Sequence, residues 1–305
     1  MKIKRTISII AGVTLTLFSM QIWSLKPTPP TSPTSKTKNK AFTALPGWEN
    51  SDLRPSLQAF KNSCKVFLKQ NPEKNVGNAH FSLKAKDWQP ACRAAMKLNT
   101  QSKTKIKTFF QTWFKPVAVI GHKPTQGKFT GYYAASANGS RRRTSHYSVP
   151  VYMHGSKKPI WVASAKERNT LVIEGSASIH FQDGSNMAIE YASGSGSHMV
   201  FKETENNKFH GAQNVTLSPG YSMAVDRRWI PLGTPLWLMT KVRQDFSQQS
   251  KPFQRLMIAQ DTGSKIRGAV RGDMYWGTGK KATAIAQNIR NDGSYWLLLP
   301  KKAHV

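Results

Sequence analysis

The amino-acid sequence predicts a mostly β body with a small helical region before it. After Lys115, short stretches rich in aromatic and β-branched residues alternate with clusters of Gly, Ser and Asn, which is typical of short strands. Helical spacing of apolar residues is found mainly in the segment between Asp52 and Phe114. Strands and helices do not alternate regularly, which argues against a doubly wound parallel sheet.

The N-terminus carries an export pattern. Lys2, Lys4 and Arg5 precede an apolar run over residues 7–23, as in a secretory signal or an uncleaved membrane anchor. We therefore assign residues 1–25 to such a segment, with cleavage left open. Residues 26–45 are rich in Pro, Ser, Thr and Lys and are predicted to be a linker. The pattern predicts export, with membrane association through this segment if it is not removed.

The chain is strongly basic. It has 45 Lys and Arg against 15 Asp and Glu, a formal net charge of +30. Nucleic acid, an anionic lipid surface and the acidic peptides of a cell wall would all attract such a chain. The basic residues are spread along the chain rather than gathered in one helix, and an exported protein does not meet nucleic acid in the cell. We therefore expect no specific nucleic-acid partner.

Residues 46–128 are predicted to form the helical part. Leu57, Phe60, Cys64 and Phe67 recur at three- and four-residue spacing, residues 71–79 interrupt the pattern, and a second helical patch covers 94–113. In an oxidising compartment, Cys64 and Cys92 can form a disulfide. The alternative is two buried free thiols.

The remainder is divided into a β-domain over 129–215 and a second β-rich domain over 216–302. The expected elements are strands at 129–133, 148–153, 170–173, 178–181, 187–191, 222–225, 236–240, 255–259 and 295–299, and a helix at 280–288. The sequence Gln-Asp-Gly-Ser at 182–185 predicts a hairpin turn, because Asp-Gly favours the positive φ that such turns need.

Three aspartates stand out in the last third, because carboxylates are scarce in this chain. Asp226, Asp261 and Asp273 each lie in a short phrase of Gly, apolar and aromatic residues. Carboxylates held in a dry pocket are standard groups for breaking glycosidic bonds. Three glycines lie between Asp261 and Asp273, which predicts a turn that brings both side chains to one cleft. The alternative is that Asp226 and Asp261 cap loops or pair with Arg227 and Arg267.

Other kinds of site find less support. No His-Glu-x-x-His pattern, close pair of metal-ligating residues or phosphate-binding Gly-rich loop is present, so we expect no metal and no organic cofactor. Trp276, followed by Gly277 and Gly279, is a candidate for stacking on a sugar ring. Trp237 and Trp296 lie in apolar runs and are expected in the core.

The ordered motifs resemble one known family. They are Phe129-Thr130-Gly131-Tyr132-Tyr133, Pro150-Val151-Tyr152, Ile173-Glu174-Gly175-Ser176, Leu217-Ser218-Pro219, Ala224-Val225-Asp226, Ile230-Pro231-Leu232-Gly233-Thr234-Pro235, Ala259-Gln260-Asp261-Thr262-Gly263, Arg271-Gly272-Asp273 and Trp276-Gly277-Thr278-Gly279. In this order they are similar to the MltA family of membrane-bound lytic murein transglycosylases, including its C-terminal "three-aspartate" (3D) domain. The segments around Cys64 and Cys92 add to the likeness, which covers about 53–301.

The resemblance implies a double-psi β-barrel joined to a second, here reduced, β-domain, with a substrate groove between them. It implies cleavage of peptidoglycan glycan strands between N-acetylmuramic acid and N-acetylglucosamine, with formation of a 1,6-anhydro sugar. It also implies a location on the periplasmic side of a Gram-negative envelope, associated with the outer or inner membrane. A water-using glycoside hydrolase and a non-catalytic wall-binding protein are the alternatives.

The resemblance also assigns roles. Asp273 matches the catalytic acid and base, Asp261 a supporting aspartate, and Thr130, Tyr132 and Ser176 residues that line the groove. Three further residues are predicted to contact substrate: Glu174, Asp226 and Trp276. The chain departs from the family pattern at Glu174, where Gln is usual, and at Ala134-Ala135, where Glu-Pro is usual. The lipid-bearing cysteine of the family is also missing.

Overall fold

The structure is a computed structural model that describes residues 38–39, 42–119, 127–205, 208–243 and 249–302. The predicted export segment and most of the predicted linker therefore lie outside the described residues. Among the described residues, none of the helices combines the length and the apolar character that crossing a membrane requires.

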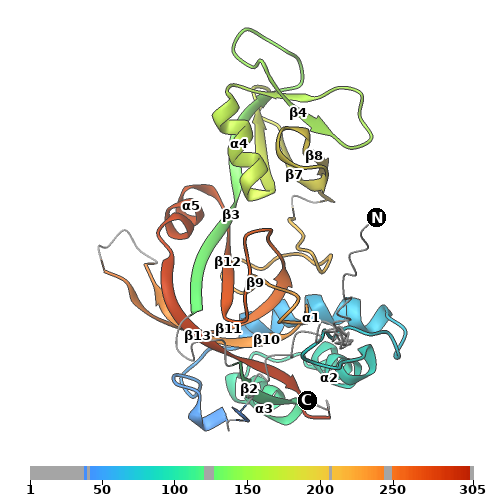
Figure 1. The fold of residues 1–305 in the computed structure, drawn as a ribbon, viewed down its shortest axis with the longest axis vertical. Coiled ribbons are helices and arrows are strands. Elements are labelled where there is room, and N and C mark those ends of the chain that lie inside the picture. The colour runs from blue at the N-terminus through green and yellow to red at the C-terminus, as the bar shows by residue number, and fades with distance from the viewer. Residues whose placement is uncertain (1–37, 40–41, 120–126, 206–207, 244–248, 303–305) are drawn as a thin grey trace, which may run out of the picture. The chain divides into compact units, whose positions relative to one another are not determined.

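The described residues form thirteen strands and five α-helices, which confirms the mostly β class (Figure 1). The helices are α1 Arg54–Lys69, α2 Ala85–Lys97, α3 Lys103–Trp113, α4 Ala165–Glu174 and α5 Gly279–Gln287. The strands are β1 Lys38–Asn39, β2 Phe114–Ala118, β3 Gly127–Ser140, β4 Val149–Met153, β5 Ile160–Val162, β6 Ser176–Phe181, β7 Asn186–Ser193, β8 Val200–Glu203, β9 Ser222–Val225, β10 Pro235–Val242, β11 Lys251–Asp261, β12 Arg271–Thr278 and β13 Arg290–Pro300.

Six strands close into a larger barrel, in the order β13-β10-β11-β9-β12-β3 and back to β13. The pairs β9–β11 and β3–β12 are parallel, and the other pairs in the ring are antiparallel. Closure removes the unpaired strand edges that an open sheet exposes. Trp237, Leu256 and Leu297 fill the core and are fully buried. This mixed ring is consistent with the double-psi barrel that the resemblance implies.

A smaller barrel also closes, in the order β3-β5-β4-β8-β7-β6 and back to β3. Its core holds Val151, Ile179, Ile189 and Phe201, all nearly inaccessible to solvent. The 14-residue strand β3 belongs to both rings. Its first half pairs with β12 and β13, and its second half with β5 and β6. In Figure 1 it is the long green strand that links the two parts.

The shared strand changes the predicted domain boundaries. The segments 129–215 and 216–302 do not separate the two barrels, because β3 completes the larger barrel while the rest of 129–215 builds the smaller one.

The C-terminal end of the predicted linker, 26–45, belongs to the folded body. Leu45 is 2% exposed, and the ring of Phe42 lies 4.8 Å from that of Trp48, which in turn lies 5.1 Å from Trp237.

One predicted strand is wrong. Residues 170–173 are the end of helix α4, not a strand. Ser164 caps the helix, because its Oγ accepts from the N–H of Glu167 and the Glu167 side chain accepts from the N–H of Ser164. This reciprocal capping starts the helix, and Gly175 at φ 70° ends it in the left-handed conformation. The Ser-x-x-Glu pattern is visible in the sequence and could have identified the helix.

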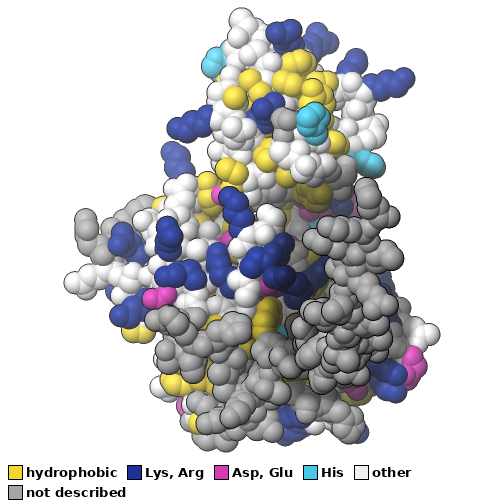
Figure 2. All heavy atoms as spheres, viewed as in Figure 1, with side chains coloured by type: hydrophobic (Ala, Val, Ile, Leu, Met, Phe, Trp, Pro, Cys, Tyr) yellow, Lys and Arg dark blue, Asp and Glu magenta, His cyan; other side chains and the backbone are white. Residues whose placement is uncertain are grey.

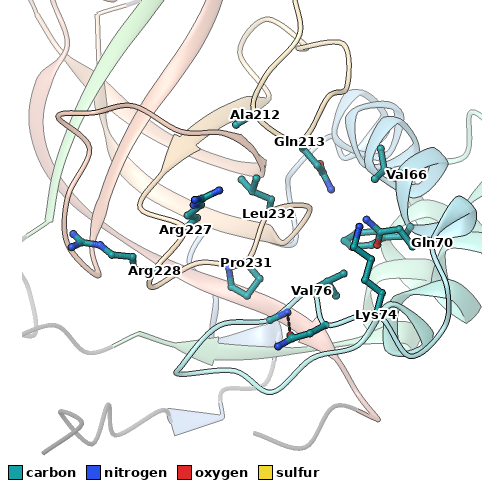
Figure 3. Close-up of a pocket in the computed structure, with 13 residues that line it drawn as sticks. Val66, Gln70, Lys74, Val76, Ala212, Gln213, Arg227, Arg228, Pro231 and Leu232 are labelled. Carbon is teal, nitrogen blue, oxygen red and sulfur yellow. Dashed lines mark hydrogen bonds between the residues drawn. The ribbon is translucent and has the colours of Figure 1, made fainter. Parts of the chain in front are cut away.

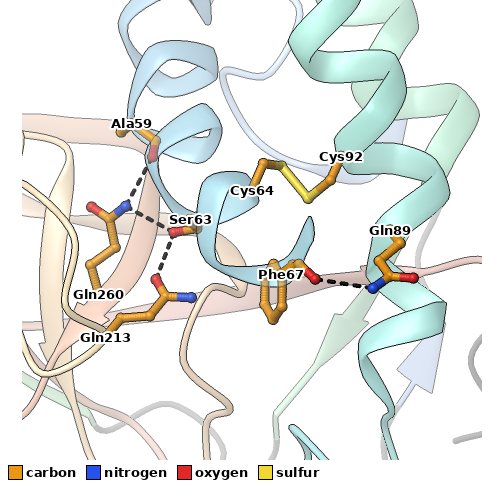
Figure 4. Close-up of a disulfide and its surroundings, with 8 residues drawn as sticks. All are labelled: Ala59, Ser63, Cys64, Phe67, Gln89, Cys92, Gln213 and Gln260. Carbon is orange, nitrogen blue, oxygen red and sulfur yellow. Dashed lines mark hydrogen bonds between the residues drawn. A yellow bond between two sulfur atoms is a disulfide. The ribbon is translucent and has the colours of Figure 1, made fainter. Parts of the chain in front are cut away.

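The helical region is held together by a disulfide and an aromatic stack. Cys64 on α1 and Cys92 on α2 are bonded, with Cα atoms 5.0 Å apart (Figure 4). Beside them the rings of Phe67 and Trp88 stack at 5.0 Å, nearly parallel at 2°. All four side chains are buried, so α1 and α2 pack as one unit.

A buried polar network fixes this unit on the larger barrel. Gln260 on β11 donates from Nε2 to the Ser63 hydroxyl and to the Ala59 carbonyl, both at 2.9 Å (Figure 4). Ser63 in turn donates to Gln213 Oε1 at 2.7 Å. Gln260 is the residue immediately before Asp261. The network therefore ties α1 to the strand end that carries one of the predicted functional aspartates.

Candidate active site

Thr130, Asp273, Ala224 and Asp261 lie at one register position across four neighbouring strands of the larger barrel. Asp273 pairs with Thr130 on β3 and with Ala224 on β9, and Ala224 also pairs with Asp261 on β11. Paired residues on adjacent strands project from the same face. With strands about 4.8 Å apart, the two aspartate Cα atoms lie roughly 10 Å from each other. Ala224, with its small side chain, is the residue between them in this row.

Asp273 is a partly buried carboxyl with one close donor. The Thr130 hydroxyl donates to Oδ1 of Asp273 at 2.6 Å, and Arg271 Nη2 donates to that hydroxyl at 3.0 Å. Burial raises the pKa of Asp273, while the hydrogen bond from Thr130 and the charge of Arg271 oppose the rise and the charge of Asp261 adds to it. Burial disfavours the ionised form, so this carboxyl holds its proton at higher pH than an exposed aspartate.

Asp261 accepts more hydrogen bonds from the protein than Asp273 does. Its Oδ1 accepts from the N–H groups of Ala212 at 2.9 Å and Thr262 at 2.8 Å, and its Oδ2 accepts from the Tyr132 hydroxyl at 2.8 Å. Burial raises the pKa of Asp261, and these three hydrogen bonds oppose the rise. Gly211 lets the chain come this close, because a Cβ there would lie 2.4 Å from the Gln260 carbonyl oxygen.

Two tyrosines form one wall beside the aspartates. Tyr132 and Tyr275 are paired on β3 and β12, and their ring centroids are 5.3 Å apart. Burial raises the pKa of both hydroxyls, and the charge of Asp261 raises them further. Both tyrosines are therefore neutral at ordinary pH, and Tyr132 acts as a donor to Asp261.

Glu174 brings a third carboxyl to this region from the smaller barrel. It is the last residue of α4, and its Oε2 accepts from the N–H of Tyr133 at 3.4 Å. Burial raises the pKa of Glu174 to about 7, and the charge of Asp273 contributes to the rise. Ser176, two residues further on, begins β6 and is 9% exposed.

The structure does not bring Asp226 into this row. It is 1% exposed. Its two oxygens accept four hydrogen bonds from Arg228 and one from the N–H of Gly268, and the Arg228 hydrogen bonds lower its pKa to about 2. The alternative of a loop ion pair therefore describes Asp226, with Arg228 rather than Arg227 as its partner. We assign it no contact with substrate.

Trp276 points away from the aspartates. Side chains alternate along a strand, so Trp276, three residues after Asp273 on β12, lies on the opposite face, where it packs against Phe253 at 6.0 Å. Its indole nitrogen is buried and has no hydrogen-bond partner among the described residues. The structure does not support the predicted sugar contact. In the described part of the chain, no three His, Cys, Asp or Glu side chains are grouped as a metal site would need.

Comparisons with known proteins show similarity in one domain and in the fold. The model of the 3D domain family matches residues 221–299. The lytic transglycosylase LtgG of Burkholderia pseudomallei is 25% identical, with a TM-score of 0.65 over 87% of this chain and 96% of that one. A membrane-bound lytic murein transglycosylase from Agrobacterium tumefaciens is 20% identical, with a TM-score of 0.75 over 87% and 98%.

Escherichia coli MltA with bound chitohexaose is 20% identical, with a TM-score of 0.57 over 80% of this chain and 89% of that one. A search of curated protein sequences gives no match. The chain contains a 3D domain and has the fold of the MltA-type lytic transglycosylases. The 3D domain supplies Asp261 and Asp273, whereas Thr130, Tyr132 and Glu174 come from outside it.

Replacing Glu174 by Gln is expected to make the stability of this MltA-type fold less dependent on pH. The folded-state pKa of Glu174, about 7, lies above the ordinary value of 4.5. Between these values the unfolded chain loses the proton and the folded one keeps it, so stability falls as pH rises from about 4.5 through 7. The pKa difference corresponds to about 3 kcal/mol. Because Glu174 is only half-buried, solvent screening reduces the expected gain in stability of the variant to roughly 2 kcal/mol at pH 8, and no difference is expected at pH 4.

Urea unfolding at the two pH values measures this difference. Glu203→Gln, at an exposed position on β8 of the same barrel, is the matched control and should show little change at either pH. An equal effect of Glu174→Gln at pH 4 and pH 8 would contradict a raised pKa of Glu174 in the folded protein.

Proposed function

We propose that the protein is a peptidoglycan lytic transglycosylase. It cleaves the β-1,4 bond between N-acetylmuramic acid and N-acetylglucosamine and leaves 1,6-anhydromuramic acid ends. The observation that carries this proposal is the pair of carboxyls in one row of the larger barrel, of which Asp273 is the partly buried one with a raised pKa and a single close donor. Their partners Thr130 and Tyr132 lie on β3, just before the residues of β3 that pair within the smaller barrel.

In the proposed reaction, Asp273 acts first as acid and then as base. Its proton passes to the glycosidic oxygen while the bond from that oxygen to C1 of the muramic acid breaks. The C6 hydroxyl of the same sugar then bonds to C1 and gives its proton to the Asp273 carboxylate. No water is consumed, and Asp273 ends in its starting state. The raised pKa favours the protonated form that the first step needs.

Asp261 supports the positive charge that develops on the sugar ring. The donors Ala212, Thr262 and Tyr132 orient its carboxylate and favour its ionised form. Thr130 positions Asp273, and Arg271 positions Thr130. Glu174 lies on the facing barrel, where it would contact the bound glycan. In this scheme each of these residues acts by holding or orienting a group, and Asp273 alone transfers a proton.

The comparisons support this proposal. LtgG, a lytic transglycosylase, is 25% identical over nearly its whole length, and the shared fold binds chitohexaose in the Escherichia coli protein. We further propose that the protein acts on the periplasmic side of a Gram-negative envelope. The export pattern in residues 1–25, the disulfide between Cys64 and Cys92, and the "membrane-bound" description of the Agrobacterium relative support this location.

Digestion of purified murein tests the proposal directly. The expected products carry anhydromuramic acid ends and weigh one water molecule less than the products of hydrolysis, which mass spectrometry distinguishes. Products with reducing ends would identify a water-using glycoside hydrolase. Strong binding to murein without any released product would identify a wall-binding protein that lacks catalysis.

A further inference from the structure

A cavity of about 530 Å³ lies beside the candidate active site (Figure 3). The end of α1, the loop at 74–77 and the loop after β9 form its walls. Ala212 also lines it, and the N–H of Ala212 is the group that donates to Oδ1 of Asp261. One residue therefore separates the cavity from the carboxylate row. Arg227, also in the wall, is three residues beyond Ala224 of that row, at most roughly 10 Å along the chain.

The cavity wall is basic, as is much of the face of the molecule drawn in Figure 2, where Lys and Arg side chains are dark blue. Lys74, Arg227 and Arg228 line it, and its lining contains no Asp or Glu. Arg228 is neutralised by Asp226 at 2.6 Å. Lys74 and Arg227 have no acidic partner in the described part of the chain, and the nearby Glu73 is taken up by Lys84 and Lys86, at 2.7 and 2.6 Å. Two uncompensated positive charges at one cavity favour an anion.

The polar groups of the cavity wall indicate which hydrogen-bonding groups a ligand should carry. Oε1 of Gln70 is buried without a hydrogen-bond partner among the described residues, so it lacks a donor. The Oε1 of Gln213 accepts a hydrogen bond from the Ser63 hydroxyl. Figure 3 shows the side-chain amide of Gln213 directed from the facing loop toward the cavity. Val66 and Leu232 provide apolar surface between these groups. The wall therefore suits a ligand with carboxylates, N–H donors and small apolar groups together.

We propose that this cavity binds the carboxylate-bearing peptide stem of the glycan strand. The inference rests on the proposed function, because in murein such peptides are attached to the sugars. Lys74 and Arg227 pair with the carboxylates, and Gln70 accepts from a peptide N–H. A stem of four or five residues spans up to roughly 18 Å, and the cavity begins at Ala212, whose N–H contacts Asp261.

The double substitution Lys74→Ala and Arg227→Ala tests this proposal. Two substrates are compared: murein glycan fragments that carry their peptides, and the same fragments after an amidase has removed the peptides. We expect KM for the peptide-bearing substrate to rise about tenfold, as for the loss of two partly solvated charge contacts. Activity on the peptide-free substrate should be unchanged.

The control removes two exposed lysines of the same helical region, by Lys65→Ala and Lys97→Ala. It has the same net charge as the test variant and should behave like the parent. Equal losses on both substrates, or none on either, would overturn the proposal. If KM rose as much in the control variant, the effect would come from net charge and the proposed site would be rejected.

Binding of the free murein tetrapeptide, measured by NMR titration, separates this proposal from the proposed function. The parent should bind the peptide, and the double variant should bind it at least tenfold more weakly, whether or not murein is cleaved. A tetrapeptide with amidated carboxyl groups should bind as weakly to the parent. Equal binding of the amidated peptide would contradict a site for carboxylates.

Discussion

Replacement of Asp273 by Asn is expected to reduce the release of anhydro products by about 10³-fold or more. General acid and base catalysis contribute about 10²–10⁴-fold, and in the proposed reaction one carboxyl serves both steps. An amide neither gives its proton to the glycosidic oxygen nor takes one from the C6 hydroxyl. Product release from purified murein, followed by mass spectrometry, measures the effect.

The fold should tolerate this change. The amide oxygen of Asn can still accept the Thr130 hydroxyl at the position where Oδ1 accepts it now. The substitution also removes a partly buried negative charge whose ionisation burial opposes. The melting temperature of the variant should therefore equal or exceed that of the parent, so a loss of activity is attributable to chemistry.

Asp292→Asn is the matched control. This residue lies on β13 of the same barrel, its side chain is 68% exposed, and it pairs with Lys128 at 2.7 Å. The control should retain full activity. Full turnover by the Asp273 variant would reject Asp273 as the acid and leave Asp261 or Glu174 to be tested in its place.

Removal of the disulfide by Cys64→Ala and Cys92→Ala is expected to lower the free energy of unfolding by about 3–4 kcal/mol. The bridge joins residues 28 positions apart, and it restricts the unfolded chain over that loop. Both cysteines are fully buried. The stacked Phe67 and Trp88 rings beside them would keep some of the contact between α1 and α2.

Urea unfolding of the double variant under oxidising conditions measures this cost. The parent protein treated with a reductant should show a comparable loss, while the double variant should not respond to the reductant. Since α1 also holds Gln260 through Ser63 and Ala59, activity should fall at temperatures where α1 separates from the barrel. Unchanged stability of the double variant would show that packing alone holds the two helices.

Local patterns predicted much of this fold. Most strands and helix α5 lie within a few residues of their predicted positions, because alternating or continuous apolar runs end at Gly, Pro or Asn. The order of the strands around the barrels was not accessible in this way, since β3 pairs with β12 across more than a hundred residues. Residues 271–278 were interpreted only as motifs, so strand β12 was missed.

The candidate site, too, was predicted only in part from the sequence. The scarcity of carboxylates and their setting singled out Asp261 and Asp273, which the structure places in one row. The direction of the side chains was predicted less well than the identity of the aspartates. Once β12 is known as a strand, Arg271 falls on the face of Asp273, and Trp276 falls on the other. The donor Ala212 could not be predicted, because a backbone N–H carries no signature in the sequence.

The strand common to both barrels has a consequence for how this protein could be divided or inherited. Residues 221–299, cut out of the chain, would leave an open seam on either side of the vacant β3 position, at β12 and β13. Residues 221–299 are therefore recognisable as one domain in sequence, but they do not close the larger barrel without β3. A gene rearrangement that moved this segment into another protein would also have to supply a strand at the position of β3.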